Sequence, residues 1–179
     1  MNQQAIILLL REKHNSFINY INELTPDDFQ FVYKNKWSAG QQLEHLVLCT
    51  KPLLQVFSMD KKTIEQNFGI TDRPGISYES LMRKYDEKLK EGGKAPERFV
   101  PNAISYEQKE VLTESLRQTI SNLCIKIEKF TEEELDQLLI PHPLLGNITF
   151  REMMFNAIYH VQHHQQQAKQ NLLQKNSNT

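Results

Sequence analysis

Apolar residues recur at intervals of three and four positions in four long stretches, and this pattern constrains the fold more than any other feature of the chain. The stretches cover about residues 3–24, the segment after Ser38, residues 106–130 and the segment after Thr149. An α-helix turns once in about 3.6 residues, so this spacing gathers apolar side chains on one face. The clearest seam has steps of 4, 4, 3, 4 and 3 and consists of Leu112, Leu116, Ile120, Leu123, Ile127 and Phe130. The pattern predicts an all-α four-helix bundle, with no β-strand and no internal repeat.

The first helix is expected to end at Thr25-Pro26, because the residue before a proline avoids the α region. Its repeating face is predicted to hold Leu9, Lys13, Phe17, Tyr20 and Leu24. The second helix has a proline within its pattern, so a kink or a break is expected there, near Cys49. That proline is Pro52, and the apolar arc around it contains Leu43, Leu46, Val47, Leu53, Leu54 and Phe57.

Capping boxes mark the start of three helices. In this motif a Ser or Thr is followed three residues later by Glu or Gln, and each side chain binds the backbone N–H of the other residue. Ser38 with Gln41 predicts the start of the second helix in this way. Two further pairs, Thr131 with Glu134 and Thr149 with Glu152, predict a short extra helix and the fourth long helix, the latter reaching about Leu173.

A long connection separates the second and third helices. Residues 58–105 contain repeated glycine and proline, and only the segment from Ser80 to Lys90 is typical of a short helix. A connection of this length indicates a crossover over the bundle rather than a tight hairpin. We therefore expect one domain over residues 1–179, with a polar tail at about 174–179.

Composition and charge exclude several classes of function. The net charge is -1 and the isoelectric point is about 6.6, with basic residues spread along the chain, so no nucleic-acid partner is expected. The apolar run from Ala5 to Leu10 is too short for a secretory core or a membrane span, so no membrane partner is expected. The two cysteines, Cys49 and Cys124, form no CxxC motif and fit reduced thiols in a cytoplasmic protein.

Three histidines close together in the last helix carry the strongest chemical signal. His160 and His164 are four residues apart, so both face the same side of a helix and could hold one metal ion. On a helical wheel both lie within or at the edge of the apolar arc, whereas His163 is turned about 60° outward. The alternative is that His160 and His164 bind no metal and only form hydrogen bonds with each other or with a backbone group. Val161 replaces the glutamate of the HExxH motif, so a metalloprotease is not expected.

His45 supplies a candidate third ligand, because it lies two turns into the second helix at the edge of the apolar arc. Metal sites in four-helix bundles are built from inward side chains of facing helices, and three imidazoles leave an open position on the ion. Cys49, one turn further, could approach the same site but is expected to be a packing residue. His14 is expected to be solvated, and His142 to be a loop residue that could line the site mouth.

Three segments resemble motifs of the DinB/YfiT-like superfamily, in the same order along the chain. Residues 37–46 read Trp-Ser-Ala-Gly-Gln-Gln-Leu-Glu-His-Leu and resemble its second-helix motif. Residues 142–149 read His-Pro-Leu-Leu-Gly-Asn-Ile-Thr and resemble the turn before its last helix. His160, His164 and Gln165 resemble its closing motif, and Lys51-Pro52-Leu53 also looks like the family.

The resemblance implies a four-helix bundle of the DinB/YfiT type, commonly a homodimer, with a divalent metal ion bound by His45, His160 and His164. No ligand role is carried over to His163. Some relatives are S-transferases or isomerases that use low-molecular-weight thiols such as bacillithiol or mycothiol, others look like metal-dependent hydrolases, and many have no known activity. Imidazole ligation suits zinc or nickel.

Three functions follow as expectations, and no catalytic residue is assigned for any of them. In the first, the metal holds the thiolate of a low-molecular-weight thiol, which attacks an electrophilic small-molecule substrate. In the second, metal-bound hydroxide hydrolyses a substrate, which would benefit from a nearby carboxylate base. No Asp or Glu lies one turn from the three histidines on the same face, which favours the thiol S-transferase. In the third, the ion is structural and the protein binds metal in a stress response without turnover.

Overall fold

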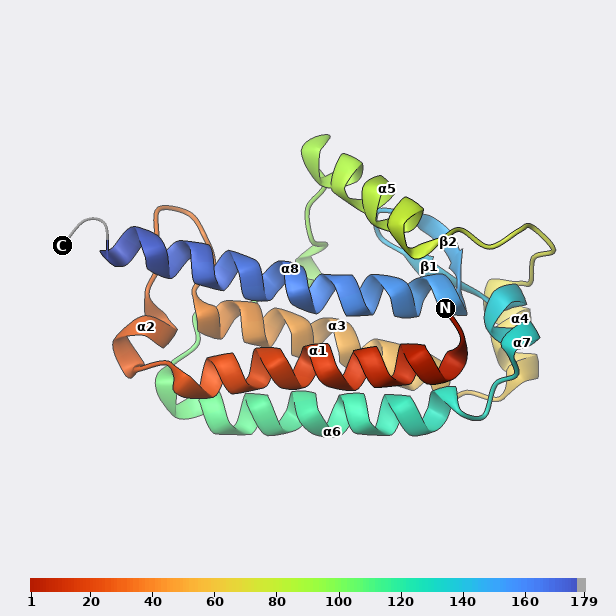
Figure 1. Ribbon diagram of the computed structural model, residues 1–179, viewed down its shortest axis with the longest axis horizontal. Helices are drawn as coiled ribbons and strands as arrows, with labels where there is room; N and C mark the ends of the chain where they lie inside the picture. The colour runs from red at the N-terminus through yellow and green to blue at the C-terminus, as the bar shows by residue number, and fades with distance from the viewer. Residues whose placement is uncertain (177–179) are drawn as a thin grey trace.

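The computed structural model describes residues 1–176 and shows four long helices lying side by side, as Figure 1 illustrates. These bundle helices are α1 (Gln3–Glu23), α3 (Ala39–Phe57), α6 (Lys109–Ile127) and α8 (Phe150–Asn176). Helix α1 packs against α6 and α8, and α3 packs against the same two neighbours. The all-α four-helix bundle is therefore confirmed. The polar tail was expected from about residue 174, but α8 continues to Asn176, and residues 177–179 lie outside the described part of the chain.

Shorter elements surround the bundle. The predicted short helix in the crossover is confirmed as α5 (Tyr78–Lys90), which lies against α8 outside the bundle in Figure 1. The helix predicted after Thr131 is α7 (Glu132–Gln137). Helices α2 (Pro26–Gln30) and α4 (Lys61–Phe68) were not predicted, because each offers too few residues to show a helical period. Two 3₁₀ turns, η1 (Glu97–Phe99) and η2 (Tyr106–Gln108), complete the crossover, and η2 replaces the expected first turn of the third helix.

A two-stranded antiparallel hairpin contradicts the prediction that the chain has no strand. Strand β1 (Leu139–His142) pairs with β2 (Gly146–Thr149), so that Leu139 lies opposite Thr149 and His142 opposite Gly146. Gly146 has a φ of +71°, a backbone conformation that glycine adopts without steric cost. Strands of four residues are too short for alternation to be read from the sequence. His142, predicted as a loop residue, is thus the last residue of β1.

The three predicted capping boxes are confirmed. At the start of α3 the Ser38 N–H donates to Gln41 Oε1 at 3.0 Å, and the Gln41 N–H donates to Ser38 Oγ at 3.2 Å. The same reciprocal pairs form at Thr131 with Glu134 and at Thr149 with Glu152. Each box satisfies two backbone donors that the helix leaves free, which fixes where α3, α7 and α8 begin.

A kink or a break is expected near Cys49, and the break does not occur, because α3 passes through Pro52 as one continuous helix. Proline removes only one hydrogen-bond donor from a helix, and the buried face of α3 holds the two halves of the helix against the core.

The buried face of α1 differs from the predicted one. The sequence pattern suggests a face through Leu9, Lys13, Phe17, Tyr20 and Leu24, of which Phe17 and Leu24 are buried. The other buried residues include Leu10, His14, Ile18 and Ile21, each one position after a residue of that face. Leu9 and Tyr20 are only partly buried against the core. Both faces carry enough apolar residues to satisfy a helical period, so only packing against α6 and α8 selects one. As a result His14 is buried rather than solvated.

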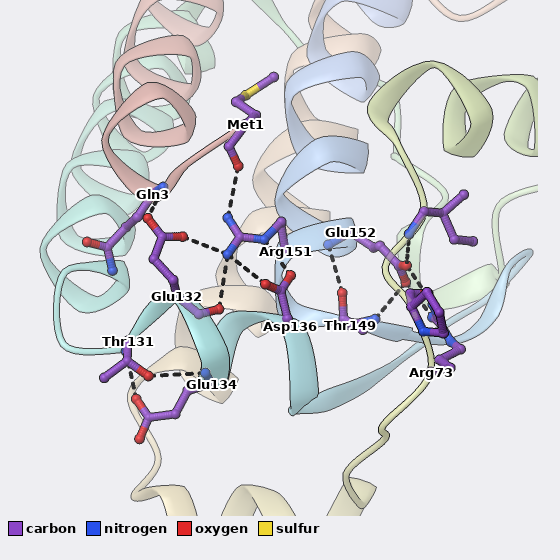
Figure 2. A network of polar contacts seen from close by, with 12 residues as sticks. Met1, Gln3, Arg73, Thr131, Glu132, Glu134, Asp136, Thr149, Arg151 and Glu152 are labelled. Atoms are coloured by element: carbon purple, nitrogen blue, oxygen red, sulfur yellow. Dashed lines mark hydrogen bonds and ion pairs between the residues drawn. The ribbon is translucent and has the colours of Figure 1, made fainter.

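A polar network anchors the first turn of α8 to three other parts of the chain (Figure 2). The Arg151 guanidinium donates to Asp136 and Glu132 of α7, with N–O distances of 2.5 and 2.6 Å, and to the Met1 carbonyl at 2.9 Å. Buried Glu152 accepts from Arg73 Nη1 and Nη2 at 2.7 and 2.5 Å, and from the Ile76 N–H at 2.9 Å. These hydrogen bonds fix the crossover and the N-terminus against the start of α8, and so fix the direction in which α8 presents its later residues.

Within residues 1–176 there is no helix with both the length and the apolar character that crossing a membrane requires.

Candidate metal centre

The imidazoles of His45, His160 and His164 converge on one point between α3 and α8. His160 Nε2 lies 3.2 Å from His45 Nε2 and 2.9 Å from His164 Nε2. One ring nitrogen of each residue lies within 4.8 Å of the other two, and the three form the sole such group of His, Cys, Asp or Glu in the described residues. The sequence therefore identified the residues that the fold brings together.

A backbone carbonyl fixes the ring of His45. His45 Nδ1 lies 2.7 Å from the carbonyl oxygen of Phe99, which belongs to the crossover. A carbonyl can only accept, so Nδ1 carries the proton and Nε2 keeps its lone pair. Metal-ligating histidines commonly bind a carbonyl or carboxylate through the second nitrogen in this way.

A chain of side-chain amides fixes the ring of His164. Its Nδ1 hydrogen-bonds to Oε1 of buried Gln42, which again leaves Nε2 unprotonated. Gln42 Nε2 donates to Gln167 Oε1 at 3.2 Å, and Gln167 Nε2 donates to His163 Nε2 at 2.8 Å. His163 therefore lies outside the convergent group, as predicted, but is linked to it through two glutamines. The sequence reasoning missed Gln42, although it lies three residues before His45 in α3.

Trp37 covers the side of the site next to the start of α3. Its ring centroid lies 4.9 Å from that of His45 and 6.2 Å from that of His164, nearly parallel to the latter at 19°. The Trp37 carbonyl accepts from Asn171 Nδ2 at 2.9 Å, which holds the tryptophan against α8. The sequence reasoning gave Trp37 no role at the site, although it directly precedes the Ser38 cap.

Burial keeps the three imidazoles neutral. His45 and His164 are buried and His160 is half-buried. Burial lowers the pKa of all three rings, and the pKa values of His160 and His164 fall well below the ordinary histidine value. Neutral imidazole is the form that binds a metal ion, so the site is prepared for a ligand role at neutral pH.

The arrangement fits a tetrahedral divalent ion. Two nitrogens bound to one such ion at about 2.0–2.1 Å lie roughly 3.3 Å apart, close to the observed separations of 3.2 and 2.9 Å. At His45 and His164 these nitrogens present lone pairs rather than protons to the shared point, and a cation is the group that satisfies several converging lone pairs at once. The three residues can therefore hold a metal ion with a fourth position left open.

A cavity of about 250 Å³ adjoins His45 and His160. Its walls come from α1, α3, α4, α8, the hairpin and the crossover, and are mostly apolar. Two exposed cations, Lys94 and Arg98, contribute to the part of the wall nearest solvent. Among the described residues that line it, none is Asp or Glu. The crossover therefore supplies the hydrogen bond to His45 and part of the cavity, but no carboxylate.

Three further side chains from the sequence analysis line the same cavity. His14 was predicted to be solvated, and His142 to be a loop residue that could line the mouth; both line the cavity from outside the convergent group. Burial lowers the pKa of each of these two imidazoles to about 4. Cys49 Sγ lies 3.6 Å from His45 Nε2, and burial raises the pKa of this thiol to about 12. Burial thus favours the protonated form of the Cys49 thiol, in keeping with the packing role expected of it.

The sequence model of the DinB superfamily matches residues 9–168. The chain belongs to the DinB superfamily. The matched region of this DinB-superfamily chain contains His45, His160 and His164 together with the crossover and the hairpin. No curated protein sequence matches the chain.

Proposed function

We propose that this DinB-superfamily protein binds a divalent metal ion, zinc or nickel, through His45, His160 and His164, and is a thiol-dependent S-transferase. The observation that carries the proposal is the convergence of three neutral imidazole nitrogens beside an apolar cavity, whose wall includes His45 and His160. A divalent ion held there supplies one chemical property, which is to lower the pKa of a thiol at its open position and so favour the thiolate near neutral pH.

The residues of the chain perform the remaining tasks. The Phe99 carbonyl and Gln42 orient His45 and His164, so that both lone pairs stay directed at the shared point. The apolar walls exclude water, which protects a thiolate from competition by hydroxide. Lys94 and Arg98 favour a thiol that carries a carboxylate or phosphate. The thiolate sulfur then forms a bond to an electrophilic carbon of the substrate, and the leaving group departs with the electrons of the broken bond.

The absence of a carboxylate in the described cavity wall favours this reaction over hydrolysis. Hydrolysis by metal-bound hydroxide benefits from a nearby base that accepts the proton of the bound water. The carboxylate closest in sequence, Glu44, is engaged elsewhere, because its Oε2 accepts from the Asn102 N–H at 2.8 Å. A thiol that is already ionised requires no such base.

Metal content is the first test, because each enzymatic function depends on it. Elemental analysis of the purified protein is expected to find zinc or nickel at about one ion per chain. The His164→Ala variant is expected to lose the ion, and the matched His163→Ala variant to retain it. A protein without metal, or a His164→Ala variant with unchanged metal content, contradicts the proposed site.

Activity is the second test. Monochlorobimane with glutathione, cysteine or bacillithiol is expected to give conjugate at a rate that falls on chelation and returns with the metal. Hydrolysis of an ester that is lost on chelation, without turnover of any thiol, would favour the hydrolase. Unfolding on metal removal, with no activity to lose, would indicate a structural ion. Homodimer formation and the cytoplasmic location stay predictions.

A further inference from the structure

Two buried polar atoms on residues that line the cavity have no hydrogen-bond partner, namely His14 Nε2 and Asn156 Nδ2. The two residues are only 1% and 5% exposed. The one other such atom in the described residues is the Tyr20 hydroxyl, and Tyr20 does not line the cavity. Buried polar groups in native proteins are nearly always paired, so two unpaired ones at one cavity require an explanation.

The hydrogen-bonding role of the unpaired His14 atom is fixed by its neighbour. His14 Nδ1 lies 2.8 Å from the carbonyl oxygen of Leu10, so Nδ1 carries the proton. Nε2 therefore offers a lone pair and can only accept. The lowered pKa of His14, about 4, agrees with a neutral ring at pH 7.

The role of the unpaired Asn156 atom is fixed through the hairpin. His142 Nδ1 accepts from the N–H groups of Leu144 and Leu145 at 3.1 and 3.2 Å, so the proton of His142 is on Nε2. The Asn156 side chain interacts with the His142 ring, and because a protonated Nε2 can only donate, the atom suited to face it is the amide oxygen, Oδ1. The Asn156 amide is thus held in one orientation, and its NH₂ group is the donor left unpaired.

The position of this pair relates it to the metal centre. Asn156 precedes His160 by four residues in α8, and therefore lies on the same face about 6 Å along the helix axis. Binding cavities are typically apolar with a few polar groups that fix the orientation of the ligand. His14 and Asn156 are such groups, and Asn156 lies one helical turn from His160.

We infer that His14 and Asn156 form a recognition subsite for a neutral polar group of the substrate, a carboxamide or a hydroxyl, which accepts from Asn156 Nδ2 and donates to His14 Nε2. Calling the ligand a substrate rests on the proposed function. The subsite itself requires only the cavity. A carboxylate fits poorly, because it has no proton to donate and meets the lone pair of His14. The substrate class is therefore a small apolar electrophile that carries one amide or hydroxyl. This group is expected about 6 Å from the reacting carbon, the length of four residues along a helix.

Binding of small probes to the full-length protein tests the subsite. A cavity of about 150 Å³ can hold benzene, so a cavity of about 250 Å³ can hold a monosubstituted benzene. Benzamide, ethylbenzene and benzoate are titrated by ligand-observed NMR against metal-loaded and metal-free protein. The Asn156→Leu and His14→Phe variants are each expected to weaken benzamide about tenfold relative to ethylbenzene. Benzoate is expected to bind more weakly than benzamide to the wild-type protein.

The Tyr20→Phe variant is the matched control, because it removes a buried unpaired hydroxyl outside the cavity. It is expected to leave the preference for benzamide unchanged. If Asn156→Leu fails to fold, Asn156→Asp retains the acceptor for His142 and still removes the donor. The inference is overturned if benzamide does not bind, or if the variants weaken benzamide and ethylbenzene equally, as expected when trapped water alone meets these atoms. If the protein prefers benzamide to ethylbenzene but contains no metal and turns over no thiol, only the proposed function is overturned.

Discussion

Helix α8 contains two polar regions that differ in hydrogen bonding: the polar groups of one are fully paired within the protein, and those of the other are not. In its first turn, Arg151 and Glu152 each bind several partners, which join α8 to α7, the N-terminus and the crossover (Figure 2). Further along the helix, Asn156 Nδ2 is a buried donor without a partner, and His164 Nε2 directs its lone pair to the point that it shares with His45 and His160. Satisfied polar groups stabilise a fold, whereas unsatisfied ones lower stability and are available to a ligand. By this criterion Arg151 and Glu152 form the anchor of α8, and the region of Asn156 and His164 forms its site.

Removing a convergent histidine should have the largest effect. The His45→Ala variant is expected to lose metal affinity by more than the roughly hundredfold that loss of an outer-shell partner can cause, since it removes one of three ligands. Competition with a chromogenic chelator measures this affinity. The bundle is expected to stay folded by circular dichroism, because the core residues of α3 are unchanged. An equally tight complex would show that His45 is not a ligand.

The buried histidines of the cavity should make stability depend on pH. The pKa values of His14 and His142 fall from 6.5 to about 4 in the folded protein. Between these values the unfolded chain binds more protons, so stability falls as the pH decreases from 6.5 toward 4. In metal-free protein, the free energy of unfolding of the His14→Phe variant is expected to fall by about 3 kcal/mol less than that of the wild type over this pH range. Urea unfolding at several pH values measures the difference, and parallel curves would contradict the neutral, buried state of His14.

Removing the anchor should affect stability and spare the site. The Glu152→Ala variant leaves Arg73 and two backbone N–H groups without their acceptor, and is expected to cost about 2 kcal/mol of unfolding free energy. Denaturant unfolding measures this cost. As a matched control, Glu114→Ala breaks an exposed ion pair with Arg117 and is expected to cost less than about 0.5 kcal/mol. Loss of metal from the folded Glu152→Ala protein would show that anchor and site are not separate.

The smallest effects on metal affinity are expected from residues that neighbour the three histidines without being ligands. Gln42 orients His164 but is not itself a ligand, so Gln42→Leu is expected to weaken metal binding about tenfold without preventing it. Chelator competition again gives the affinity. The Cys49→Ala variant changes a neighbour of His45 but keeps the hydrogen bonds that orient the rings, so it is expected to bind metal as the wild type does. Equal affinities for Gln42→Leu and wild type would remove the orienting role.

Local patterns in the sequence were sufficient for the four long helices and for the candidate ligands. The seam of α6, the capping boxes of α3 and α8 and the spacing of His160 and His164 each depend on residues within a few turns of one another. Helical periodicity converts such spacings into directions in space, so it correctly set His163 aside from the other two histidines. His45 could be added because the capping box at Ser38 fixes the phase of its helix.

Tertiary packing decided the remaining features, because these depend on which surfaces meet. Two faces of α1 satisfy the same periodicity, and packing against α6 and α8 selected the one that buries His14. The carbonyl of Phe99 reaches His45 across 54 positions in the sequence, and Gln42 reaches His164 across 122. No spacing rule predicts such pairs. The sequence by itself thus determined a helical bundle with three candidate ligands, and only the packing decided how those ligands are oriented and which unpaired atoms lie beside them.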